Sequence, residues 1–169
     1  MKIKFLLILL LTGLIAIGCD STSSGDDDED LDPIVGKWLS EGQGQVAPGL
    51  AGPPFRTRKI DAEFFENQTY LVVSTDSSNA TVTFRGNWVA DEPNAQGIRA
   101  ITLTQSEPSA LTSRGIFRII DNAMEYEVIQ TDPPIQGITA PNPADGFGST
   151  KFNDFPLGQT WVQRYIRVN

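Results

Sequence analysis

Alternation of apolar and polar residues with a period of two runs through most of the chain after residue 33. In residues 56–65, for example, Ile60, Ala62 and Phe64 alternate with the charged residues between them. Because successive side chains of a β-strand point to opposite faces of a sheet, this alternation predicts strands with one face buried in a core. No segment of comparable length has the periodicity of an amphipathic helix, so we expect an all-β fold.

Eight alternating runs are separated by clusters of Asn, Asp, Gly, Ser and Pro, the residues that favour turns. The expected strands span residues 34–40, 56–65, 69–75, 80–89, 98–105, 115–120, 123–130 and 159–168. Short connections favour antiparallel pairing of neighbours, and eight strands in that order close into an up-and-down barrel. A sandwich of two sheets would produce the same alternation and stays open as an alternative.

Two connections are much longer than tight turns. Residues 41–54 are rich in Gly and Pro, and residues 131–158 contain several further Pro and Gly clusters. Connections of this length in a compact domain are uncommon and often carry function. Phe147, Phe152 and Phe155 predict that the second connection packs partly against the barrel.

Residues 1–18 have the pattern of a secretion signal. Two lysines precede an almost unbroken apolar run over residues 5–17, which is shorter than the ~20 residues that a membrane-spanning helix needs. Residues 16–19, Ala-Ile-Gly-Cys, resemble the lipobox of bacterial lipoproteins. The resemblance implies cleavage before Cys19 and attachment of diacylglycerol and a further acyl chain such as palmitate, which would anchor the protein to a membrane. A plain secretion signal beside an incidental cysteine is the alternative.

Residues 19–32 carry seven acidic residues and no basic residue, so we expect a disordered tether ahead of a folded domain over residues 33–169. An acidic run shortly after the cysteine resembles the surface-export signal of Bacteroidetes lipoproteins. That resemblance implies an outer-membrane protein of the cell envelope that faces outward. Asp20, directly after Cys19, resembles instead the inner-membrane retention mark of enteric bacteria, and both interpretations stay open.

The charge and residue inventory excludes several classes of function. The net charge of −8 lies mostly in the tether, since residues 33–169 hold 11 basic and 14 acidic residues, and no basic surface for nucleic acid is expected. The chain has no histidine, one cysteine, and no glycine motif that binds phosphate, so we expect no metal site and no cofactor. Two carboxylate pairs would suit a hydrolase and equally suit a solvated strand face, so no catalytic residue is assigned: Asp61 with Glu63, and Glu125 with Glu127.

Gly36 and Trp38, in the sequence Gly-Lys-Trp, open the first expected strand. This Gly-x-Trp motif, together with the eight-strand pattern, resembles the lipocalin family, and more closely the lipocalin-like domains of bacterial lipoproteins. The resemblance implies a barrel whose base is closed by an arginine of the last strand packed over the tryptophan, which would be a cation–π pair. Arg164 and Arg167 are the two candidates. The family resemblance also implies that the long first connection acts as a lid.

The sequence therefore favours a non-enzymatic protein that binds a small hydrophobic or amphipathic ligand inside the barrel. Aromatic residues on the rows expected to face inward are the candidate cavity residues: Phe64, Tyr70, Phe84, Trp88 and Tyr126. Small residues at Gly86, Ala100 and Thr102 would leave space inside. The alternative is a filled barrel that docks a protein partner through its Pro/Gly-rich connections, and no motif identifies that partner.

Overall fold

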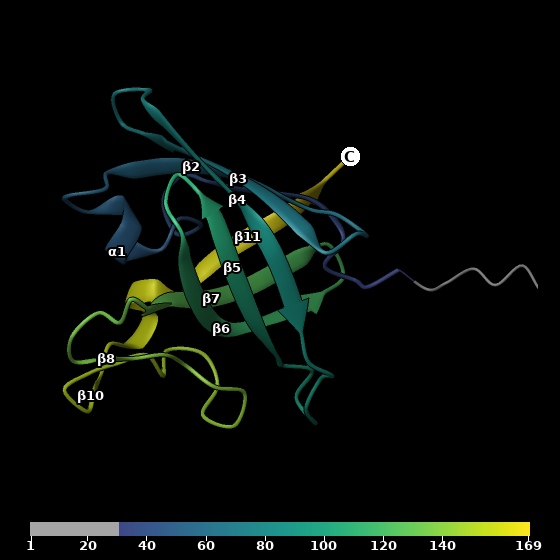
Figure 1. The fold of residues 1–169 in the computed structure, drawn as a ribbon, viewed down its shortest axis with the longest axis vertical. Coiled ribbons are helices and arrows are strands. Elements are labelled where there is room, and N and C mark those ends of the chain that lie inside the picture. The colour runs from purple at the N-terminus through teal and green to yellow at the C-terminus, as the bar shows by residue number, and fades with distance from the viewer. Residues whose placement is uncertain (1–30) are drawn as a thin grey trace, which may run out of the picture.

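The computed structural model describes residues 31–169, so the predicted signal peptide and nearly all of the predicted tether lie outside the described residues. Within them, eight antiparallel strands close into a barrel in the order β1-β11-β7-β6-β5-β4-β3-β2 (Figure 1). The barrel strands are β1 (Gly36–Glu41), β2 (Thr57–Phe64), β3 (Thr69–Asp76), β4 (Thr81–Ala90), β5 (Arg99–Glu107), β6 (Leu111–Ile120), β7 (Ala123–Asp132) and β11 (Gln163–Val168). The expected up-and-down barrel is confirmed, and the sandwich alternative is not what forms.

Two strand starts differ from the sequence prediction by more than any other boundary. β6 begins at Leu111 rather than at residue 115, because its first residues pair with the end of β5, with Leu111 opposite Gln105. The last strand begins at Gln163 rather than at residue 159, because a 3-10 helix, η1 (Gly158–Trp161), comes first. Both differences arise from contacts with other segments. Alternation of residues within one strand gives no information about such contacts.

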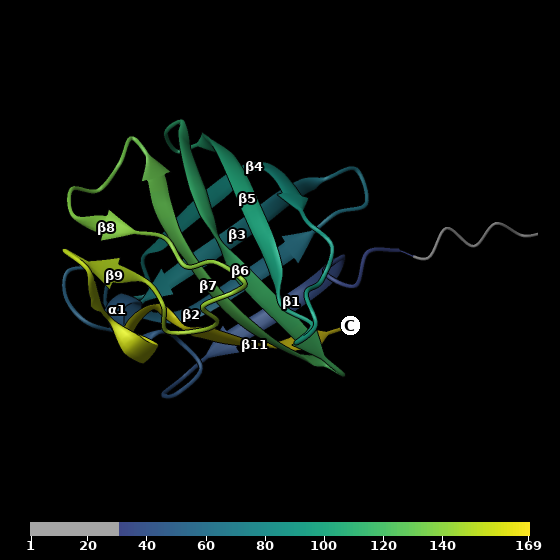
Figure 2. The same cartoon turned by 90° about the horizontal axis from the view of Figure 1, so that it is seen from below.

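The two ends of the barrel are different. Residues 31–35 and the C-terminal end of β11 lie at one end, which we call the closed end, whereas α1 (Pro48–Ala51) lies at the opposite, open end (Figures 1 and 2). Apolar side chains fill the closed half of the interior, and the most deeply buried of them include Ile34, Trp38, Trp88, Ile101, Phe117 and Met124. The hydrophobic core therefore lies next to the point where the chain enters the barrel.

The second long connection carries a small sheet of its own, formed by β8 (Ile138–Thr139), β9 (Lys151–Phe152) and β10 (Phe155–Pro156). It covers part of the outer face of the barrel. Ile116 and Glu127 alternate with inward-facing neighbours and so point outward, yet both are fully buried. Oε2 of Glu127 accepts a hydrogen bond from the Gly148 amide at 2.6 Å, and its Oε1 accepts two from the amide and hydroxyl of Thr150 at 3.1 and 2.6 Å.

The aromatic residues expected to dock this connection have different environments. Phe147 is half-buried, and the guanidinium carbon of Arg118 lies 5.6 Å from its ring centroid. Phe152 and Phe155 remain exposed, by 47% and 76%. Glu127, which alternation paired with Glu125 on one strand face, thus ties the connection to the barrel. No helix within residues 31–169 is long and apolar enough to cross a bilayer.

Candidate functional site

An interior cavity of about 270 Å³ occupies the open half of the barrel. Its lining comes from seven of the barrel strands and from the first long connection, and is Leu50, Phe55, Thr57, Ile60, Ala62, Phe64, Tyr70, Val72, Ser74, Phe84, Leu103, Gln105, Ser113, Tyr126, Val128 and Tyr165. None of these side chains is charged. The volume is just below the range of about 300–1,000 Å³ typical of ligand pockets, so the cavity suits a small molecule with a largely apolar surface.

Leu50 and Phe55 bring the first long connection to the cavity. Leu50 lies on α1, and Phe55 follows it by five residues and is 53% exposed. Ala47, just before α1, is anchored because its amide donates to Oε1 of Gln163 at 2.9 Å. The connection therefore lies at the open end with one side tied to β11 and an aromatic side chain left free at the mouth.

Three tyrosines line the cavity from three strands: Tyr70 on β3, Tyr126 on β7 and Tyr165 on β11. The rings of Tyr126 and Tyr165 meet edge to face with centroids 5.9 Å apart. Burial raises the pKa of Tyr70 to about 12 and raises the pKa of Tyr165 further. Burial, together with the nearby Tyr165 and Tyr70, also holds the pKa of Tyr126 well above its ordinary value.

Three of the other four polar side chains of the lining are bonded to protein groups. Oγ1 of Thr57 and Oγ of Ser74 lie 3.3 Å apart and share a hydrogen bond. Nε2 of Gln105 donates to the carbonyl of Ser109 at 2.9 Å. These groups lie toward the strand ends that border the open end, so they form a polar rim that is partly hydrogen-bonded within the protein.

Four of the five aromatic residues predicted for the cavity lie on its wall: Phe64, Tyr70, Phe84 and Tyr126. The fifth, Trp88, does not reach it. Its ring packs edge-on against Phe64 with centroids 6.0 Å apart, and its Nε1 donates to the carbonyl of Phe65 at 3.3 Å. Trp88 therefore belongs to the closed-end core. Tyr165 was not among the predicted cavity residues, although it shares a strand face with Gln163 and Arg167.

The small residues expected to leave interior space do not do so. A Cβ on Gly86 would lie 2.1 Å from the carbonyl oxygen of Thr104, so this glycine permits a close approach of two strands at a β-bulge. Ala100 and Thr102 alternate with Ile101 and Leu103, which face the interior, and therefore point outward. The cavity arises instead because the closed-end core does not extend to the open end.

The residues of the Gly-x-Trp motif meet at the closed end. The guanidinium carbon of Arg167 lies 4.2 Å from the ring centroid of Trp38, and its Nη1 donates to the Val35 carbonyl at 2.8 Å. Gly36 has a φ of +126°, and a Cβ there would lie 2.7 Å from Nη1 of Arg167. Arg164 points to the outer face, where it bonds to Oε1 of Gln159 at 3.0 Å.

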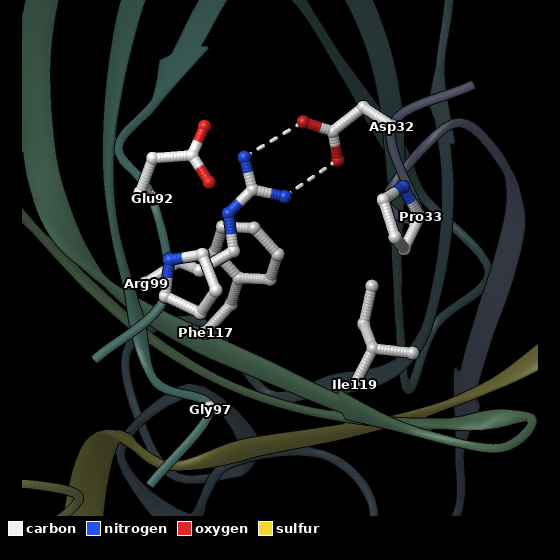
Figure 3. A pocket seen from close by; sticks show the side chains of 8 residues that line it. Asp32, Pro33, Glu92, Gly97, Arg99, Phe117 and Ile119 are labelled. Carbon is white, nitrogen blue, oxygen red and sulfur yellow. Dashed lines mark hydrogen bonds and ion pairs between the residues drawn. The ribbon is translucent and has the colours of Figure 1, made fainter. Parts of the chain in front are cut away.

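A second depression, of about 440 Å³, lies at the closed end (Figure 3). Arg99 spans it, with Nη1 and Nη2 each 2.7 Å from a different carboxylate oxygen of Asp32, and its guanidinium carbon lies 5.1 Å from the ring centroid of Phe117. Asp32, which the sequence places in the tether, thus ends up as part of the barrel base. The guanidinium of Arg99 is the strongest donor group in this depression, and both of its Nη atoms are already bonded to Asp32. The depression is therefore a weaker candidate for ligand binding than the interior cavity.

The acidic pairs that alternate along strands are engaged in separate contacts. Asp61 pairs with Lys59 at 3.0 Å, and Glu125 pairs with Arg118 at 2.6 Å. Glu127 is held beneath the second connection. Among residues 31–169, no three acidic, cysteine or histidine side chains gather in a way that could hold a metal ion.

The chain was also compared with known proteins. No protein-family model, curated protein or solved structure matches it.

Proposed function

We propose that this chain is a lipoprotein of the cell envelope, held to the outer membrane by lipid on Cys19 and facing outward, whose barrel binds a small hydrophobic or amphipathic ligand without chemical change. The observation that carries the binding role is the interior cavity of about 270 Å³ with an uncharged, largely apolar lining. The eight-stranded closed barrel agrees with the lipocalin-like resemblance of Gly36 and Trp38.

The position of the first connection supports entry of a ligand from the open end. Phe55 stands at the mouth and is half-exposed, and Leu50 lines the cavity from α1. A segment that touches both the interior and the solvent can cover a ligand once it is inside, as the lid of a lipocalin does. A non-enzymatic role fits the engagement of Glu125 and Glu127 in separate structural contacts.

Ligand binding is tested with residues 20–169, which include every strand, the core and the ion pairs of the barrel. Fluorescence of the neutral apolar dye N-phenylnaphthylamine should rise on binding at micromolar concentration. Val72→Phe fills the cavity and should abolish the signal, whereas Val73→Phe adds the same ring on the outer face of the same strand and should leave it unchanged. Equal signals from both variants, or none from the unmodified protein, would count against the proposal.

Anchoring is tested separately with the full-length chain in a bacterial host that processes lipoproteins. The full chain should take up labelled palmitate and sediment with outer membranes, and Cys19→Ser should remove the label. Surface exposure should make the barrel accessible to a protease added to intact cells. A soluble, unlabelled full-length product would contradict the anchor and leave the binding role standing.

A second candidate function is docking of a protein partner, and the exposed apolar residues of the β8–β10 sheet favour it. Phe155 is 76% exposed, and Phe152 and Ile135 are 47% and 43% exposed. Crosslinking in cells, compared between the unmodified chain and Phe155→Ser, is the test. A specific adduct that disappears in the variant would support docking.

A further inference from the structure

All three tyrosines of the chain lie around the same cavity, although the chain has nine phenylalanines from which an apolar lining could be built. They project from β3, β7 and β11, and since β7 and β11 are neighbours in the barrel, the Tyr70 ring approaches the cavity from the side opposite the other two. The Tyr126 ring contacts that of Tyr165, and its raised pKa owes part of its shift to both Tyr165 and Tyr70. The three hydroxyl groups therefore share one space.

Within residues 31–169, no hydrogen bond is made by the hydroxyl of Tyr70, Tyr126 or Tyr165. Among the other polar side chains of the lining, Thr57 bonds to Ser74 and Gln105 bonds to the Ser109 carbonyl. None of these hydroxyl oxygens is among the buried atoms left without a partner, so they are reachable from the cavity. Phenylalanine would fill nearly the same volume, and a hydroxyl that bonds to no protein group adds no hydrogen bond to the barrel. Barrel stability therefore does not account for these hydroxyls, whereas a ligand with its own polar atoms does.

The charge of the ligand follows from the rest of the lining. No lysine, arginine, aspartate or glutamate borders the cavity, so nothing there compensates a carboxylate or an ammonium group taken out of water. The arginines nearest the interior, Arg99 and Arg167, lie in the closed end and are bound to Asp32 and to Trp38. A buried tyrosine hydroxyl stays protonated at neutral pH and donates a hydrogen bond, which a ligand oxygen can accept.

We infer that the cavity selects uncharged ligands that carry an oxygen acceptor on an apolar body, such as an alcohol, ether or ester, and that Tyr70, Tyr126 and Tyr165 donate the hydrogen bonds that select them. This inference rests on the proposed binding function and names the ligand class for the same cavity. The three tyrosines are then specificity-determining residues, and they do more than provide apolar contacts in the cavity wall.

The test displaces bound N-phenylnaphthylamine from residues 20–169 with compounds that share one alkyl chain: octanol, octyl methyl ether, octanoate and octylamine. Octanol and the ether should bind at least about tenfold more tightly than the two ions, because burial of an unpaired charge opposes binding. At least one Tyr→Phe variant should weaken octanol binding about three- to tenfold, the value of one lost hydrogen bond, while leaving the affinity for the dye unchanged. The single octanol oxygen has two lone pairs and cannot accept from all three hydroxyls at once.

Thr83→Val is the matched control, since it removes a hydroxyl from the outer face of β4 beside Phe84. It should leave every affinity unchanged. Octanoate binding as tightly as octanol, or three Tyr→Phe variants that all retain octanol affinity, would overturn the selection inference even when the dye binds. Absence of dye binding to the unmodified protein would instead overturn the proposed function itself, so the two failures are distinguishable.

Discussion

Arg167 packs its guanidinium over the indole of Trp38, with its carbon 4.2 Å from the ring centroid, in the seam where the last barrel strand meets the first. The same group donates to the backbone carbonyls of Val35 and Pro33. The Arg167 side chain thus connects β11 to Trp38 of the core and to residues 33–35, where the chain enters the barrel. We therefore expect Arg167 to contribute strongly to the stability of the closed end.

Arg167→Ala should therefore lower the free energy of unfolding by about 2–4 kcal/mol, the combined loss of one cation–π contact and two hydrogen bonds to carbonyls. Arg164→Ala is the matched control on the same strand. Because Arg164 lies on the outer face, is only partly buried and bonds to Gln159 rather than to the core, its removal should lower stability by no more than about 1 kcal/mol. Urea unfolding followed by tryptophan fluorescence measures both, and equal losses would contradict this account of the seam.

Because of Asp32, part of the barrel's free energy of unfolding should depend on pH in the acidic range. Burial acts to raise the pKa of Asp32, but hydrogen bonds from Arg99 and the Ile34 amide, together with the charge of Arg99, lower it overall. A lowered pKa means that the folded state releases this proton more readily than the unfolded chain does. The stabilisation is therefore complete above the unfolded value near pH 4 and is lost as pH falls through the folded pKa.

Asp32→Asn provides the comparison. At neutral pH this variant should unfold at lower urea concentration than the unmodified protein, because it leaves Arg99 without its carboxylate. The difference between the two should shrink as the pH is lowered below about 4. A difference that stays constant over that range would show that the ion pair contributes nothing that depends on protonation.

The tyrosines predict a second, alkaline dependence. Unfolded tyrosines ionise near pH 10, whereas burial moves the pKa of Tyr70 to about 12 and those of Tyr126 and Tyr165 higher. Between these values the unfolded chain has lost protons that the folded chain retains, so the free energy of unfolding should fall as pH rises from about 10 to 12.

Ultraviolet absorbance of tyrosinate measures this directly, since no tyrosine lies outside the cavity. The folded protein should show no ionisation with a midpoint near pH 10, and the signal should appear together with the loss of structure seen by circular dichroism. A full tyrosinate signal at pH 10 from protein that is still folded would contradict the raised pKa values of all three tyrosines.

Glu127 should prove essential for the second long connection. Glu127→Ala would leave the Gly148 amide and both donors of Thr150 without an acceptor in a fully buried site, which should lower stability by about 2–4 kcal/mol. Glu125→Ala removes only a partly exposed ion pair with Arg118 and should cost less than about 1 kcal/mol. Limited proteolysis should cut residues 133–150 faster in the first variant alone.

Alternation predicted the strands and four aromatic residues of the cavity wall, because it fixes which face of each strand turns inward. The short connections, rather than alternation, favoured a barrel over a sandwich. Alternation correctly directed Phe64, Tyr70, Phe84 and Tyr126 to the interior. It does not fix how deep a residue lies along the barrel, since that depends on the tilt and stagger of the closed sheet. For Trp88, the predicted inward orientation is therefore confirmed, but its predicted position at the cavity is wrong because the residue lies nearer the closed end.

The alternation of the last strand also distinguishes the two arginines at the C-terminal end. Arg167 shares its strand face with Tyr165, whereas Arg164 lies on the other face, so alternation alone separates the two candidates for packing on Trp38 and also brings Tyr165 to the cavity. Glu127 is different in kind. Its partners lie more than 20 residues along the chain, inside a connection without periodicity, and no local pattern could predict that contact.

The seam itself has a consequence for how the molecule is made. β1 and β11 pair through only three register positions, Lys37 to Val168, Trp38 to Arg167 and Leu39 to Ile166. Until β11 arrives, the other seven strands form an open sheet with two unpaired edges, which invite association between chains. Pairing over so long a sequence separation is slow. A chain that emerges from the ribosome or a translocon from its N-terminus onward therefore exposes two unpaired strand edges until β11 has emerged. Binding of a chaperone to the unfolded chain would then affect the yield of folded protein more than the stability of the finished barrel does.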